Sequence, residues 1–236
     1  EGRNLFQKIR MMCYFYICIN LMEAAILFGM SFVPNFYGFL TFQLQWLYVT
    51  SHTFPGFALI FDKGTSNIMK ERPRDTEEII NRPLFKLLVL HATLMAIGVA
   101  FIYFVTYTGL YPVFHGNEVG VVSTEWSLTQ QKARTMAIVT IILVESLMVL
   151  SIRRINMSLI DSHKAEDFSF RVYFFIALVI IGTVGLIYTP DVQLVMATLG
   201  IVFEFMWLTW LDWLLIIGAT LPSIIGIELY KWSKRR

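Results

Sequence analysis

Long apolar stretches dominate this chain and limit what it can fold into. A helix needs about 20 mostly apolar residues to cross a bilayer, and six stretches meet this need: residues 12–33, 42–61, 85–107, 133–152, 170–188 and 213–230. Only 15% of the 236 residues are charged, whereas a soluble domain carries roughly 25%. The sequence therefore predicts an all-α fold, a polytopic membrane helix bundle with six transmembrane helices, as one domain over residues 1–236.

The apolar stretch from Leu194 to Tyr230 is too long for one span and leaves a choice of topology. Residues 194–210 could be a short interfacial segment or a seventh span. The basic residues favour six spans, because 17 of the 19 Lys and Arg residues then lie on one face, with only Lys132 and Arg134 opposite. The positive-inside rule makes that face cytoplasmic, together with both termini.

Ionisable residues at bilayer depth are costly and therefore mark candidate functional positions. Glu23 lies in the middle of the first span and Asn20 three residues before it, a spacing that puts both on one helical face. Two oxygen donors at this depth suit a hard cation. The alternative is a hydrogen bond between helices, with Glu23 protonated.

Pro55 interrupts the second span, since proline lacks a backbone donor and crowds the carbonyl one turn back. We expect the helix to kink or unwind near Ser51 and His52 and to free carbonyl oxygens. Non-helical backbone at this depth is tolerated only inside a protein or around a watery cavity. His52 could be a soft ligand, a proton carrier or a hydrogen-bond donor within the bundle.

Four more acidic residues lie in or near the last three spans. Glu145, in the middle of the fourth span, could complete the same site or pair with another helix. Glu228 is expected to form an interfacial ion pair with Lys231, and Glu204 and Asp212 to lie at the interface. The net charge of +2 and the lack of a basic run interleaved with aromatics argue against a nucleic-acid partner.

Several motifs occur in the order found in one membrane-protein family. They are Asn20-x-x-Glu23, residues 54–61 (FPGFALIF), residues 68–74 (IMKERPR), residues 133–137 (ARTMA), and Asp212-Trp213 followed by residues 228–232 (ELYKW). Together they resemble helices five to ten in the C-terminal membrane region of P-type cation-transporting ATPases, the class that contains the calcium pumps. The resemblance implies the membrane transport domain of an ATP-driven pump, with part of its ion-binding site and pathway.

The resemblance also implies which residues hold the cation and where this chain departs from the calcium pumps. Those pumps place an Asn and a Thr-Asp pair in the sixth helix, where this chain has Tyr48, Ser51 and His52. The candidate metal-ligating residues are therefore Asn20, Glu23, Tyr48, Ser51, His52 and Glu145. Because His52 replaces a carboxylate, we expect a site unlike the usual calcium site: one divalent ion at most, a monovalent ion, or an ion coupled to protons.

No catalytic residue and no resident cofactor is assigned to this chain, because it contains neither the phosphorylation motif nor a nucleotide-binding motif of such pumps. The sequence opens at Glu1 without an initiator Met, so we expect a piece of a longer protein. ATP and Mg²⁺ would bind to catalytic domains outside this sequence. The expected partners are the lipid bilayer, the transported cation, and the N-terminal helices and cytoplasmic domains of the same pump, in the plasma membrane.

A second hypothesis belongs to a different class of protein. A stand-alone six-helix module, acting as a channel or as a regulatory or assembly subunit, would show the same apolar stretches without coupling to ATP. The coding sequence upstream of residue 1 separates the two, since only a pump continues into a phosphorylation motif.

Overall fold

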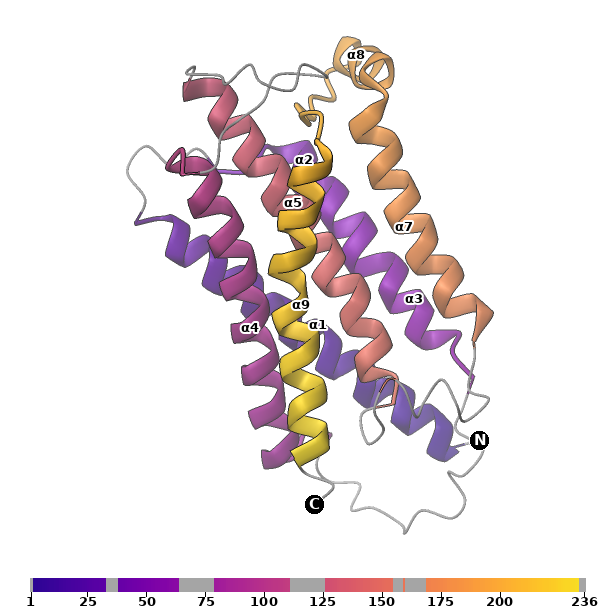
Figure 1. Ribbon diagram of the computed structural model, residues 1–236. Coiled ribbons are helices and arrows are strands. Elements are labelled where there is room, and N and C mark those ends of the chain that lie inside the picture. The colour runs from indigo at the N-terminus through magenta and orange to yellow at the C-terminus, as the bar shows by residue number, and fades with distance from the viewer. Residues whose placement is uncertain are drawn as a thin grey trace.

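The computed structural model describes residues 2–32, 38–63, 79–110, 126–154, 159 and 169–233. Within these ranges all regular structure is helical, as Figure 1 shows. The elements are α1 (Gly2–Met30), α2 (Thr41–Leu47), the π-helix η1 (Tyr48–Thr53), α3 (Phe54–Ile60), α4 (Arg82–Tyr107), α5 (Trp126–Ile152), α7 (Phe170–Tyr188), α8 (Pro190–Thr198) and α9 (Trp210–Ser233). The predicted all-α membrane helix bundle is confirmed.

The six predicted spans coincide with observed helices. Five helices, α1, α4, α5, α7 and α9, are each long and apolar enough to cross a membrane. The remaining span is helical from residue 41 to residue 60, but η1 divides it into α2 and α3, so neither α-helical piece reaches spanning length alone. The open choice at 194–210 is also decided: α8 ends at Thr198, and residues 201–209 form no helix.

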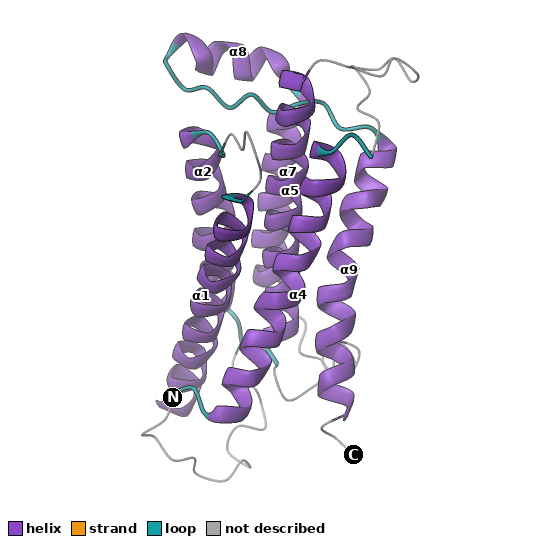
Figure 2. Cartoon of the chain, turned by 90° about the vertical axis from the view of Figure 1, so that its left-hand side faces the viewer, coloured by secondary structure: helices purple, strands orange, loops and turns teal. Residues whose placement is uncertain are grey.

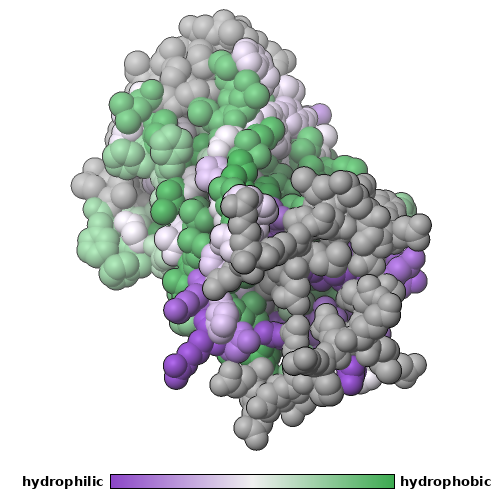
Figure 3. All heavy atoms as spheres, turned by 60° about the horizontal axis from the view of Figure 1, so that its bottom comes forward, coloured by the Kyte–Doolittle hydropathy of each residue, from purple (hydrophilic) through white to green (hydrophobic). Residues whose placement is uncertain are grey.

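Both ends of the described chain lie at the same end of the bundle. Figures 1 and 2 show the start of α1 and the end of α9 close to one level, with α8 lying across the opposite end. Hydrophilic residues gather at the end that carries the termini, and hydrophobic residues cover the flank (Figure 3). An even number of crossings produces this arrangement. The described residues include only the ends of the long predicted loops, because 64–78, 111–125 and 160–168 lie outside them.

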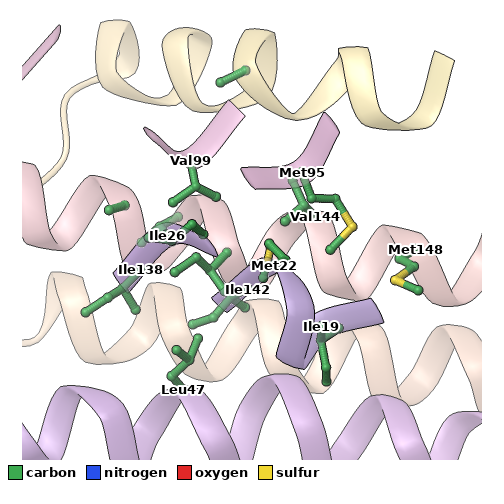
Figure 4. Packing of buried hydrophobic residues seen from close by; sticks show 14 of the residues in the cluster. Ile19, Met22, Ile26, Leu47, Met95, Val99, Ile138, Ile142, Val144 and Met148 are labelled. Carbon is green, nitrogen blue, oxygen red and sulfur yellow. The ribbon is translucent and has the colours of Figure 1, made fainter. Parts of the chain in front are cut away.

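Helix α5 forms the centre of the bundle. In its most apolar stretch 83% of the residues are buried, against 33% to 44% in the other four long helices. It packs against α1, α4, α7 and α9, and the side chains where it meets α1, α2 and α4 form one cluster (Figure 4). A helix that is apolar on all sides is expected in such a buried position.

Local sequence features explain several helix ends and contacts. The Asn81 side chain caps α4 by accepting a hydrogen bond from the Leu84 backbone N–H at 3.2 Å. Pro190 follows the end of α7 and starts α8, where its missing donor costs nothing. Helices α4 and α9 approach closely at Gly98, where an added Cβ would lie 2.5 Å from the Ala219 carbonyl oxygen.

Candidate functional site

Glu23 of α1, His52 of η1 and Glu145 of α5 meet in the interior of the bundle. Each offers one ligand atom, and these atoms lie within 4.8 Å of one another. The His52 Nε2 atom is 3.2 Å from the Glu23 Oε1 atom, and the two side chains are only 16% and 12% exposed. Three separate spans therefore bring two carboxylates and an imidazole together.

Glu145 is the most deeply buried member of this group, which we call the Glu-His-Glu cluster (Glu23, His52 and Glu145). Its exposure is 0%, and neither carboxylate oxygen has a hydrogen-bond partner within the described residues. Burying a carboxyl group without a partner costs several kcal/mol in the membrane interior. A cation or a proton at this position would remove that cost.

The sequence of η1 explains how His52 reaches the cluster. Pro55 cannot donate to the carbonyl four residues earlier and would collide with it, and a π-helical turn widens the helix at this place instead of breaking it. The predicted kink or unwinding near Ser51 is thus a π-helix. The wider turn leaves main-chain carbonyls without their usual α-helical donors.

Hydroxyl groups donate to the carbonyl oxygens around this turn. Thr50 Oγ1 donates to the Trp46 carbonyl and Ser51 Oγ to the Leu47 carbonyl, each at 2.7 Å. The Tyr16 hydroxyl, from α1, donates to the His52 carbonyl at 3.2 Å. Of the carbonyl oxygens that the sequence led us to expect as free ligands, that of His52 therefore already accepts a hydrogen bond.

Three of the six predicted site residues lie apart from the cluster or are otherwise engaged. Asn20 lies on the exposed face of α1. Tyr48 is 44% exposed, and its ring packs edge-on against His52 with centroids 4.9 Å apart. Ser51 is buried, and its hydroxyl donates to the Leu47 carbonyl. Their role as cation ligands stays a prediction.

Sequence reasoning missed Tyr16. Its hydroxyl bonds the backbone of His52, and an added Cβ on Gly56 would lie only 2.3 Å from that hydroxyl oxygen. Tyr16 precedes Glu23 by seven residues, so the two share one side of α1. The seven-residue spacing from Glu23 was the one feature of the sequence that could have indicated Tyr16. It indicates a role only when η1 is known to pack against this side of α1.

Other charged groups form ion pairs at the two ends of the bundle. The expected pair of Glu228 with Lys231 is confirmed at 2.9 Å. Asp62, at the end of α3, bonds both Arg153 and Arg154, at 2.9 Å and 3.0 Å. At the opposite end Lys132 pairs with Asp212, and Arg134 with Glu204. Sequence reasoning missed these last four ion pairs, because their members are between 70 and 92 residues apart.

The comparison with family models supplies an independent observation. The model of the family described as "Cation transporting ATPase, C-terminus" matches residues 36–233. The matched range contains His52 and Glu145, whereas Glu23 on α1 precedes it. A search of curated proteins finds no match.

Proposed function

The chain belongs to the cation-transporting ATPase family as its C-terminal membrane region, and from this premise we propose that the Glu-His-Glu cluster is part of the intramembrane ion-binding site of an ATP-driven pump. The transported cation is its substrate. Phosphorylation and ATP hydrolysis would take place in cytoplasmic domains of the same protein.

The unpartnered carboxylate of Glu145 carries this proposal. Within the described part of the chain, neither oxygen of this fully buried carboxyl group has a hydrogen-bond partner, which is energetically unfavourable, and its ligand atom lies within 4.8 Å of those of Glu23 and His52. Intramembrane ionisable groups of this kind mark ion pathways. A cation bound among the three residues would neutralise the carboxylates and supply the missing partner.

The structure of the second span suggests how such a site responds to events outside the membrane. His52 lies in η1, next to Pro55, where the regular α-helical ladder is interrupted. Single π-turns of this kind are frequent at functional sites. A rotation of α3 relative to α2 would move His52 with respect to Glu23 and Glu145, and so change the affinity for the ion.

The orientation belongs to the same proposal. The excess of basic residues supports a cytoplasmic location for the end that carries the termini, where the segment 62–86 would dock on the catalytic domains. Cysteine introduced at exposed Lys63 should then resist a membrane-impermeant maleimide on intact cells, whereas cysteine introduced at exposed Val195 on α8 should react. The reverse pattern would contradict the orientation.

The test of the site uses the full-length pump and its phosphorylation from ATP as a function of cation concentration. Glu23→Gln and Glu145→Gln should each weaken the ion dependence while expression is retained. Asp191→Asn, which removes a carboxylate from an exposed position on α8, serves as the matched control and should behave like the wild type. If phosphorylation of both Glu variants depended on cation concentration as in the wild type, the proposal would be contradicted.

A further inference from the structure

We propose that the cation bound by the Glu-His-Glu cluster is a divalent transition-metal ion of borderline softness, with Zn²⁺ as the probe, rather than Ca²⁺ or an alkali ion. This inference rests on the proposed function and specifies the substrate class of the same site. His52 is the residue that determines the specificity, since its imidazole supplies a nitrogen ligand beside two carboxylates.

The supply of oxygen ligands is the first argument. Ca²⁺ takes six to eight oxygens, from carboxylates, carbonyls and waters. Here two carboxylates converge, while the carbonyls of Trp46, Leu47 and His52 are bonded by hydroxyl groups. The cluster itself thus supplies two carboxylates and one nitrogen, fewer oxygens than Ca²⁺ usually takes.

The position of Asn20 strengthens this point. Its amide is on the exposed face of α1 and adds no oxygen to the cluster. A site of three ligands from three helices, with a position left for water, resembles the ligand number of open zinc sites rather than that of calcium sites.

The kind of donor is the second argument. Imidazole nitrogen is a poor ligand for Ca²⁺ but suits Zn²⁺ and its neighbours among the divalent metals. In a tetrahedral site with metal–ligand bonds of about 2.0 Å, neighbouring ligand atoms lie about 3.3 Å apart. The 3.2 Å between His52 Nε2 and Glu23 Oε1 fits that spacing, and Glu145, whose ligand atom lies within 4.8 Å of the other two, would move closer on binding the ion.

Charge balance is the third argument. With a neutral imidazole, the carboxylates of Glu23 and Glu145 carry two negative charges, which a divalent ion balances. An alkali ion would leave one negative charge uncompensated at bilayer depth, where isolated charges are most costly. The cluster thus favours a divalent ion over a monovalent one, and a borderline ion over a hard one.

The experiment measures phosphorylation of the full-length pump from ATP at buffered concentrations of Zn²⁺, Ca²⁺ or Na⁺. Zn²⁺ should support phosphorylation of the wild type where the other two ions do not. His52→Asp, which exchanges the nitrogen for a carboxylate, should weaken activation by Zn²⁺ roughly tenfold or more and introduce activation by Ca²⁺.

A spectroscopic readout separates direct coordination by His52 from a merely structural role. X-ray absorption at the zinc edge of the zinc-loaded pump should show scattering from a bound imidazole. That signal should disappear in His52→Gln, although His91, His115 and His163 remain in place. An unchanged imidazole signal in this variant would overturn the assignment.

Failure of this inference can be told apart from failure of the proposed function. Activation of the wild type by Ca²⁺ or Na⁺ and not by Zn²⁺ would overturn the inference. The proposed function would still stand if Glu23→Gln and Glu145→Gln removed that activation. It would fall if neither variant altered the response to any of the three ions.

Discussion

Two buried carboxylates, Glu145 and Asp212, show how differently this bundle treats its interior charges. Both side chains are 0% exposed. Asp212 forms an ion pair with Lys132 and accepts a hydrogen bond from the Thr209 backbone N–H at 2.6 Å. Glu145 has no bonding partner among the described residues. Both carboxylates are equally buried, but only Asp212 is paired, so Asp212 stabilises the fold, whereas Glu145 is the residue that we propose as a cation ligand.

The surroundings of Asp212 explain its structural role. It lies beside residues 199–209, the non-helical segment between α8 and α9. Lys132 also donates to the Trp207 carbonyl at 2.8 Å, and Gln43 donates to the Phe203 carbonyl at 2.6 Å. A segment without its own helical hydrogen bonds needs such partners, so polar groups at this end of the bundle are occupied with one another.

Breaking the satisfied pair should have the largest effect on stability. Lys132→Met leaves Asp212 buried without its cation, and such a loss costs about 3–5 kcal/mol. The free energy of unfolding of the protein in detergent measures this. Adding Asp212→Leu to the same variant should recover much of the loss, because no charge then remains unpaired. Wild-type stability of Lys132→Met would contradict the distinction drawn between the two carboxylates.

A smaller effect is expected where Tyr16 holds the backbone of η1. Gly56→Ala places a methyl group where the Tyr16 hydroxyl lies, and the hydrogen bond to the His52 carbonyl should be lost at a cost of about 0.5–1.5 kcal/mol. The cation concentration for half-maximal phosphorylation should rise as well, since His52 is no longer held in place.

The matched control for this change is Gly185→Ala on α7. No atom lies within 4 Å of a Cβ added there, so the alanine should raise stability by about 0.5–1 kcal/mol through its better helix propensity. Ion dependence should not change. An identical response of the two glycine variants would show that Tyr16 does not position His52.

The smallest effect on stability should come from the unsatisfied carboxylate itself. Glu145→Gln removes an ionisable group that has no partner to lose, and burying a neutral amide costs less than burying a charge. The free energy of unfolding should therefore not fall, in contrast to Lys132→Met. A large loss of stability in Glu145→Gln would mean that this residue, like Asp212, serves the fold.

Much of the fold could be predicted because a helix that crosses a bilayer must consist mostly of apolar residues over a set length. Apolar stretches of spanning length located the helices α1, α4, α5, α7 and α9, although α1 begins ten residues and α5 seven residues before the predicted spans. The excess of basic residues on one face selected six crossings over seven. Pro55 marked the irregular turn at η1 correctly, but not its form. Hydroxyl-bearing neighbours of Pro55 allowed a π-helix to replace the expected unwinding.

The candidate site could be predicted only residue by residue. Polar side chains in the middle of apolar stretches singled out Glu23, His52 and Glu145, because each is costly at that depth. Their meeting could not be read from the chain, since 29 residues separate His52 from Glu23 and Glu145 is on a helix far along the sequence. Helix rotation also decided that Asn20, three residues from Glu23, lies on the exposed face.

The sequence by itself determined that this protein lies in a lipid bilayer, how many spanning helices it has and where they occur. It also determined which ionisable residues lie within the membrane. These properties depend on local composition and span length. The tertiary structure decided which charges are satisfied. Lys132 and Asp212 lie 80 residues apart and form an ion pair across the bundle, whereas Glu145 has no hydrogen-bond partner among the residues that the structure describes. Whether a buried charged group finds an ion-pair or hydrogen-bond partner depends on how the helices are rotated relative to one another. Packing over the whole bundle fixes that rotation.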